Sequence, residues 1–175
     1  NFLEIANFQE KQKEAFDILL KKKCKYFLYG GAAGGGKSYF LRWAALGYGM
    51  YLASKYKIKG LPIGLFSEDY PTLKDRQILK IKQEFPRWIG HLKETRDEGL
   101  VFKVREKWGG FNILLRNLDD PSKYASSEFA GIFVEELTMN KRETFDFLRF
   151  RLRYPGIPEV KFAAATNPGN IGHVW

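Results

Sequence analysis

The residues best suited to chemistry form one glycine-rich stretch, Gly31-Ala32-Ala33-Gly34-Gly35-Gly36-Lys37-Ser38. It matches the phosphate-binding pattern G-x-x-x-x-G-K-[ST] in full, between an apolar run that predicts a strand and a segment that predicts a helix. The glycines let backbone N–H groups surround an anion at the helix N-terminus. Lys37 suits the β- and γ-phosphates of a nucleotide, and Ser38 suits Mg²⁺. We expect this loop and the adjacent Tyr39 to bind a nucleotide; the alternative is a glycine-rich turn with a chance lysine.

Two adjacent carboxylates, Glu135 and Glu136, follow a second apolar run at residues 131–134. Hydrolysis of a nucleotide needs an acid that holds the metal and its water shell, and a base that orients the attacking water. We expect Glu135 to bind Mg²⁺ through water beside Ser38. Glu136 is the expected base, with Lys37 as the second catalytic residue. The alternative is a solvated strand end, or acids that cap the segment after it.

A third polar group ends the small-residue run "VKFAAAT" at 160–166. Thr166 and Asn167 stand at its end, and Pro168 then forces the chain out of the strand. Their side chains could contact the γ-phosphate or the attacking water and so report the nucleotide state. Asn-Pro-Gly is also an ordinary turn sequence, and that interpretation would be preferred if the other two motifs were missing.

The expected elements place these motifs at strand ends. Helices are expected at residues 8–22, 37–55, 72–85 and 140–153, and strands at 25–30, 61–67, 131–137 and 160–166. Strands that are apolar throughout and alternate with helices predict an α/β fold: three layers with a mostly parallel central sheet. Two β-like runs around Gly109-Gly110 predict an antiparallel hairpin at 99–118, at or beside an edge of the sheet.

The spacing of the motifs bears on the class of ATPase. Glu135 stands 98 positions after Lys37, which leaves room for a strand between the phosphate-loop strand and the acidic strand. That arrangement is typical of the additional-strand, catalytic-glutamate division of P-loop ATPases. Nucleotide kinases usually lack such a pair of acids.

Composition sets broader limits. The 175 residues are 45% hydrophobic and 28% charged, which suits one globular domain over residues 1–175. The net charge of +9 favours a polyanionic partner, although a merely basic surface is the alternative. Cys24 is the one cysteine, so no disulfide is expected and an intracellular setting is favoured. The longest apolar stretch, at 43–53, is too short for a membrane span. The chain begins with Asn, and we expect it to be a piece of a longer protein.

With these motifs in place, the chain resembles the N-terminal ATPase domain of the large terminase of tailed bacteriophages, the motor that packages viral DNA. The resemblance runs from about Phe8 to Trp175. Its most discriminating parts are the hairpin followed by "NLDDPSKYASSEFAGIFVEEL" and the closing "NPG…HVW". It implies Walker A at 31–38, Walker B at 132–136 with Glu136 catalytic, and a coupling motif at 166–168.

The resemblance also implies a role for Gln12, since a glutamine upstream of Walker A contacts adenine in this family. An amide can donate to and accept from one adenine edge at once. Without the family, an exposed helical glutamine would be the preferred interpretation.

The family implies ATP and Mg²⁺ as ligands and double-stranded DNA as the substrate that is moved. It further implies a homo-oligomeric ring on the capsid portal, a small terminase subunit as partner, and a place in the host cytoplasm rather than in the mature virion. No membrane partner is expected. No second acidic triad is present in these 175 residues, so the nuclease of full-length terminases is not expected within them.

Two departures from the family pattern concern charge. Many terminases carry an arginine where Ala32 or Ala33 stands here, and the metal acid is usually Asp rather than Glu135. Transition-state charge on the γ-phosphoryl group still calls for a cation. The candidates are Arg76, Lys123, Arg142, Arg149, Arg151 and Arg153, or a residue of a neighbouring subunit.

Three other functions stay open on the sequence alone. One is a nucleotide or small-molecule kinase, against which the paired acids argue. The others are a different DNA-dependent, helicase-like ATPase and a nucleotide-binding module that does not hydrolyse its ligand.

Overall fold

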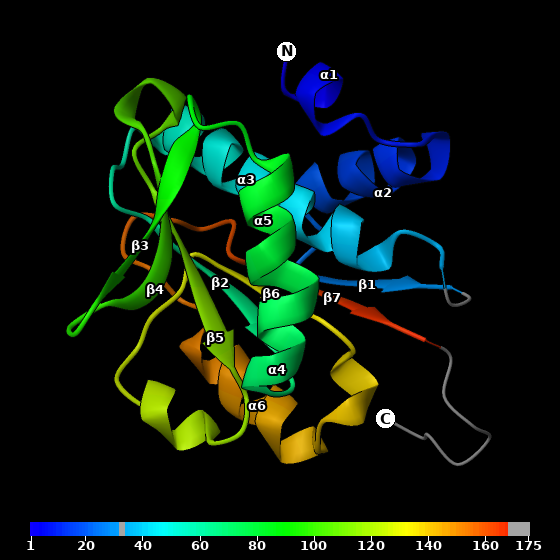
Figure 1. The fold of residues 1–175 in the computed structure, drawn as a ribbon, viewed down its shortest axis with the longest axis vertical. Coiled ribbons are helices and arrows are strands. Elements are labelled where there is room, and N and C mark those ends of the chain that lie inside the picture. Colours follow the sequence, from blue (N-terminus) through cyan, green and yellow to red (C-terminus); the bar gives the residue numbers. More distant parts are fainter. Residues whose placement is uncertain (32–33, 168–175) are drawn as a thin grey trace.

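A seven-stranded sheet forms the centre of the computed structural model, which describes residues 1–31 and 34–167 (Figure 1). The strand order is β1-β7-β6-β2-β5-β4-β3. The strands are β1 Tyr26–Gly30, β2 Pro62–Ser67, β3 Gly90–Thr95, β4 Gly99–Val104, β5 Asn112–Asn117, β6 Gly131–Val134 and β7 Lys161–Thr166. The α-helices are α1 Phe2–Ala6, α2 Glu10–Leu20, α3 Lys37–Tyr56, α4 Tyr70–Leu73, α5 Leu79–Glu84 and α6 Arg142–Arg151.

The sheet is parallel from β1 to β5 and antiparallel beyond it. The predicted hairpin is present as β4 and β5, with a 3₁₀ turn, Glu106–Trp108, before its two glycines. The sequence did not reveal β3, which pairs with β4 and forms the edge of the sheet. The mostly parallel α/β fold is therefore confirmed, and its antiparallel part is a three-stranded meander.

A strand does separate the loop strand β1 from the acidic strand β6, but the spacing argument misplaced it. The intervening strand is β7, which follows the acids in the sequence. The segment between Lys37 and β6 contains β2 to β5 instead, and these strands lie on the far side of β6. The presence of the additional strand was thus predicted correctly for the wrong reason.

The molecule has three layers, because side chains from the central strands pack against helices on both faces of the sheet. Phe133, Ala163 and Ala165 belong to the larger core, which contains α2, α3 and α5. Ile132 and Ala164, their neighbours along the same strands, belong to the second core, which contains α6. Successive side chains of a strand point to opposite faces of the sheet, so an unbroken apolar run contributes side chains to both cores.

α3 is the most enclosed helix. It is buried from Phe40 to Gly49 without interruption, because the sheet covers one side and α2 the other. Its N-terminus lies at the glycine-rich loop, as predicted. No helix within residues 1–31 and 34–167 is long and apolar enough to cross a membrane.

A buried carboxylate joins the end of α3 to the approach of β7. The carboxylate of Glu159 accepts hydrogen bonds from Tyr51 (3.0 Å), Tyr56 (2.6 Å) and Lys55, and the Tyr48 hydroxyl donates to the Glu159 backbone carbonyl. Burial raises the pKa of Glu159, but the hydrogen bonds from Lys55 and the tyrosines outweigh it and lower the pKa to about 2. The ionised form is therefore the one that stabilises the fold.

We expect the free energy of unfolding to fall as the pH drops from about 4.5 towards 2, because the folded state resists protonation of Glu159 in that window. Glu159→Gln should be less stable at pH 7 and should lose part of this pH dependence. Urea unfolding at pH 7, 5 and 3 measures both effects. The exposed Glu143→Gln is the matched control, and equal pH slopes for the two variants would contradict the assignment.

Candidate active site

The glycine-rich loop follows the C-terminal end of β1 and leads into α3. Gly34 and Gly36 have φ of 81° and 67°, a left-handed conformation that glycine adopts without strain. Gly36 is the N-cap of α3, and the Lys37 amine donates to the Gly31 carbonyl at 3.1 Å. Ala32 and Ala33 lie outside the described residues. The loop thus presents the N-terminus of a buried helix with a lysine beside it, as anion binding requires.

Glu135 lies at the centre of the site, directly after β6. Its side chain is 2% exposed. The Ser38 hydroxyl donates to Oε1, while Oε2 accepts from Gln77 Nε2 at 2.9 Å and from the Ser67 hydroxyl at 3.3 Å. The sequence predicted that Ser38 and Glu135 would lie together, and the structure places them in direct contact.

Glu136 leaves the strand in a left-handed conformation, with φ 47° and ψ 53°. For a residue other than glycine this costs about 1–3 kcal/mol, and such strain is concentrated at functional sites. Asn167 fixes the turned side chain: its backbone N–H donates to Oε2 at 3.2 Å and its Nδ2 donates to Oε1 at 3.0 Å. Thr166 is buried and bonds the Thr138 hydroxyl, so Asn167 alone of the two expected sensors reaches the acids.

Arg76 is the nearest of the proposed cations to the acids. Its Nη1 lies 3.9 Å from Glu135 Oε1 and 3.6 Å from Glu136 Oε1. The other arginine candidates make contacts elsewhere: Arg142 and Arg149 pair with Asp146, Arg153 with Glu128, and Arg151 lies over the Phe147 ring. Lys123 borders a different cavity, beside Tyr124 and Arg116.

The donor set fits a hydrated divalent cation that arrives with a nucleotide. Ser38 and Glu135 offer only oxygen atoms, which Mg²⁺ prefers, and Mg²⁺ commonly takes one or two protein ligands plus phosphates and water. Within residues 1–31 and 34–167 no group of three His, Cys, Asp or Glu side chains could form a metal cage by itself. A cavity of about 180 Å³ lies beside the acids and is bordered by Glu68, Thr72, Arg76, Met139 and Asn167.

Gln12 is buried, with 3% exposure, against the glycine-rich loop. Its Nε2 donates to the Gly36 carbonyl at 3.2 Å, and its Oε1 accepts from the Gln9 backbone at 3.0 Å. It is therefore not the exposed helical glutamine of the alternative interpretation. Contact with adenine stays a prediction, as does nucleotide contact by Tyr39, whose hydroxyl donates to the Ala6 carbonyl at 2.7 Å.

Sequence reasoning missed three polar residues that support the site: Ser67, Gln77 and Arg42. Ser67 ends an apolar strand, as Thr166 does, and that position was a usable signal. Gln77 and Arg42 lie in helices whose patterns look ordinary, and they are 0% and 3% exposed. Only tertiary contacts reveal them.

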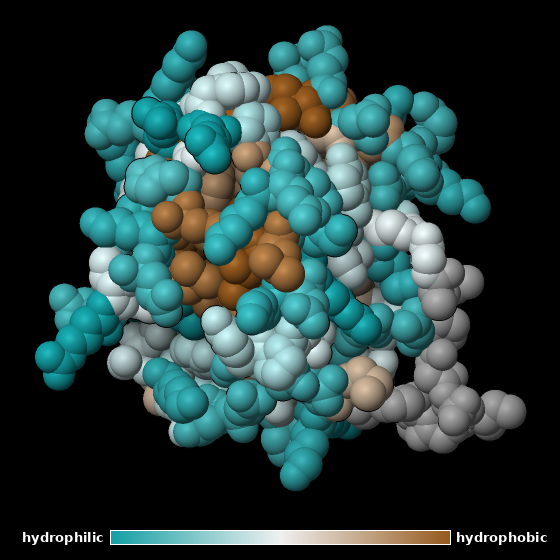
Figure 2. All heavy atoms as spheres, in the orientation of Figure 1, coloured by the Kyte–Doolittle hydropathy of each residue, from teal (hydrophilic) through white to brown (hydrophobic). Residues whose placement is uncertain are grey.

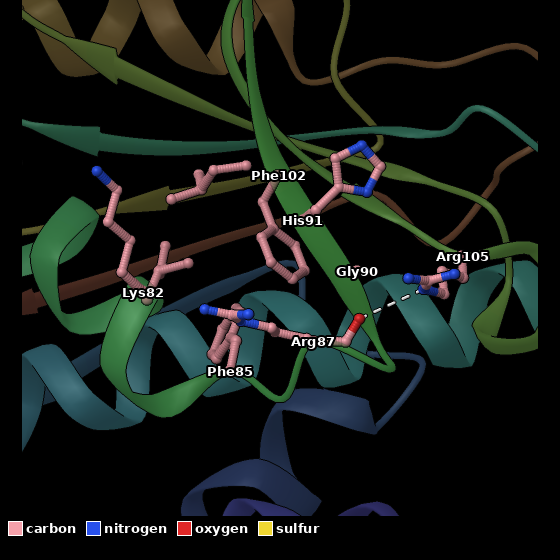
Figure 3. Close-up of a pocket in the computed structure, with 9 residues that line it drawn as sticks. Lys82, Phe85, Arg87, Gly90, His91, Phe102 and Arg105 are labelled. Atoms are coloured by element: carbon pink, nitrogen blue, oxygen red, sulfur yellow. Dashed lines mark hydrogen bonds between the residues drawn. The ribbon is translucent and has the colours of Figure 1, made fainter.

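Another cavity, of about 380 Å³, lies away from the acids, between α5 and the β3–β4 hairpin (Figure 3). Figure 2 shows apolar side chains gathered on the same face of the molecule. Phe85 and Phe102 form part of the cavity wall, and Lys82, Arg87 and Arg105 lie around it, with Arg105 Nε donating to the Arg87 carbonyl at 3.3 Å. No residue of the predicted nucleotide site borders it, so volume alone does not identify the site here.

Comparisons with known proteins place this geometry in a familiar fold. No family model and no curated protein matches the sequence. Among solved structures, the large terminase from a thermophilic bacteriophage, in complex with ATP-gamma-S, is similar to 92% of this chain with a TM-score of 0.69 and 16% identity. The HK97 bacteriophage large terminase covers 91% of the chain with a TM-score of 0.68 and 8% identity.

This chain corresponds to only part of each full-length terminase. The chain spans 38% of the terminase solved with ATP-gamma-S and 33% of the HK97 protein, but 69% of the Thermus phage P74-26 large terminase ATPase domain. The P74-26 domain covers 97% of this chain, with a TM-score of 0.61 and 11% identity. At these identities the likeness concerns the fold. The chain has the fold of the ATPase domain of bacteriophage large terminases.

Proposed function

We propose that residues 1–175 form one P-loop ATPase domain that hydrolyses ATP to drive viral double-stranded DNA into a procapsid. The observation that carries the proposal is the contact between Ser38 of the glycine-rich loop and the buried Glu135, with Glu136 held beside it. This pairing supports a metal-binding role for Ser38 and Glu135 and a general-base role for Glu136 beside the glycine-rich loop. The shared fold with large terminases supplies the DNA-packaging part of the proposal.

Each residue of the site has a defined task in this proposal. Lys37 and the loop N–H groups hold the β- and γ-phosphates, and Ser38 and Glu135 hold the cation, Glu135 through water. Mg²⁺, when bound, neutralises charge on the phosphate oxygens. Glu136 accepts a proton from water as that water attacks the γ-phosphorus and the bond to the ADP oxygen breaks.

Two further residues would act on that step. The two hydrogen bonds from Asn167 orient the Glu136 carboxylate, so a change at the end of β7 would move the base. Arg76 supplies a positive charge from the same chain close to the reacting groups, in the place of the arginine missing at Ala32 and Ala33. This assignment of Arg76 leaves room for a second cation from a neighbouring subunit.

The proposed partners follow from charge and fold. The net charge of +9 suits double-stranded DNA, and the proposal includes a homo-oligomeric ring on the capsid portal, a small terminase subunit and assembly in the host cytoplasm. The terminase of the thermophilic bacteriophage has been solved with ATP-gamma-S and with ADP, which supports a nucleotide at the corresponding place here, with Gln12 near its adenine.

We expect Glu136→Gln to lower phosphate release by about 100-fold or more, because loss of a general base costs on the order of 10²–10⁴ in rate. Binding of mant-ADP should stay within about twofold, since the amide keeps the shape of the side chain. Phosphate release and fluorescence titration measure the two effects. The control is the exposed Glu143→Gln, and unchanged turnover in Glu136→Gln would remove Glu136 from the mechanism.

We also expect duplex DNA to raise the rate of ATP hydrolysis, with an effect that declines as salt increases because phosphate contacts release counterions. Single-stranded DNA of equal length tests the helicase-like alternative, and should stimulate less than the duplex. A kinase would instead transfer the γ-phosphate to an added acceptor and release little free phosphate. ATP turnover that ignores duplex DNA at every salt concentration would argue against a DNA motor.

A further inference from the structure

The helix opposite the acids contains a wide turn. α4 and α5 continue into one another through a π-helical turn, Lys74–Ile78, in which the Leu79 N–H bonds the Lys74 carbonyl (Figure 1). π-turns are rare and occur frequently at functional sites. Two consecutive residues of this turn, Arg76 and Gln77, contact the acidic pair. The wide turn therefore lies where it determines which side chains reach Glu135.

Arg42 holds this turn from α3, one helical turn after Ser38. Its Nη1 lies 3.0 Å from the Arg76 carbonyl and 3.2 Å from Gln77 Oε1, and 3.1 Å from the Ser38 carbonyl of its own helix. Its Nε and Nη2 form a two-pronged ion pair with Glu84, at 2.7 and 2.8 Å. One buried guanidinium thus connects the phosphate-loop helix to both the π-turn and α5.

The contact with Arg42 fixes the direction of the Gln77 amide. A guanidinium only donates hydrogen bonds, so the amide oxygen must face Arg42 and the amide NH₂ must face away from it. That NH₂ group donates to Glu135 Oε2 at 2.9 Å, in a place that is 0% exposed. The Gln77 amide is neutral. It therefore donates a hydrogen bond to Glu135 without neutralising the negative charge of the carboxylate.

We infer that Gln77 and Arg42 are positioning residues for the cation held by Ser38 and Glu135. Gln77 holds the Glu135 carboxylate in the orientation that contacts the Ser38 hydroxyl, and Arg42 holds Gln77 in the donating direction. The ligand concerned is a hydrated divalent cation bound with a nucleotide. The inference rests on the proposed function, because it assigns the cation to that site.

The test measures how much Mg²⁺ strengthens the binding of mant-ADP, by fluorescence titration with Mg²⁺ and with EDTA. Partners that orient a metal ligand are worth about 10- to 100-fold in metal affinity. We therefore expect Gln77→Met to reduce the Mg²⁺-dependent gain by about tenfold or more and to leave the affinity in EDTA unchanged. A merely structural role would weaken binding equally in both conditions.

Gln83→Met is the matched control, because Gln83 is an exposed glutamine on the same helix. Among the described residues its side chain is hydrogen-bonded to Lys80, at 3.5 Å, and not to the acids. Thermal unfolding of each variant reports on folding. If Gln77→Met does not fold, Gln77→Asn replaces it: this variant keeps the amide but shortens the side chain by one methylene, so the same loss of Mg²⁺ dependence is expected.

Arg42→Lys tests whether Arg42 acts through Gln77, because an ammonium cannot reach Glu84 in two places and Gln77 as well. The double variant with Gln77→Met should then lose no more Mg²⁺ dependence than Gln77→Met alone. Additive losses, or a full Mg²⁺-dependent gain in Gln77→Met, would overturn the inference while the proposed function stands. A wild-type chain that binds no mant-ADP in either condition would overturn both.

Discussion

The Glu135 carboxylate is the group around which the other elements of this protein are arranged. A buried charge costs several kcal/mol unless hydrogen bonds replace the lost water. Here the donors come from three separate elements: Ser38 from α3, Ser67 from β2 and Gln77 from the π-turn. Each of these elements must therefore keep its place relative to β6. The same set of contacts that makes the charge tolerable also brings the phosphate loop to the acids.

Glu136 shows how the chain separates two neighbouring carboxylates into two environments. Glu135 turns towards α3, where hydroxyl and amide groups surround it. Glu136 is itself in a strained left-handed conformation, and its carboxylate accepts hydrogen bonds from Asn167, directly after β7. The strain persists because buried apolar residues hold both sides of this short segment: β6 lies before it and Leu137 after it. Two acids of the same type thus have different hydrogen-bond partners at one strand end.

Local signals in the sequence were sufficient to predict much of the fold and the positions of the motif residues. Three local patterns were read correctly, because each depends on residues within one element. The glycine pattern located the loop, the apolar run 131–134 located the acids that follow it, and the small-residue run 160–166 located Asn167. α1 and β3 were missed because they are short and carry no pattern of their own. The place of β7 between β1 and β6 was not predicted, for another reason. The spacing of strands along the chain does not determine their order in the sheet.

The supporting residues could not be predicted for a physical reason of the same kind. Gln77 and Arg42 would be ordinary polar residues on isolated helices, and a wide turn has no clear sequence signature. Their roles arise only when α3 and the helix after β2 come together. A search based on motifs alone finds the groups proposed to bind the ligand and overlooks the residues that contact and support those groups.

The alanines of β7 have a consequence for the geometry of the whole site. Parallel strands covered on both faces usually carry valine, isoleucine or leucine, yet residues 163–165 are alanine and nearly inaccessible to solvent. Such small side chains act as thin spacers between the sheet and the helices on its two faces. Ala163 and Ala165 belong to the core that contains α3, so their small side chains let this helix lie close to β7. Bulk added there would change the alignment of the loop with the acids from a distance.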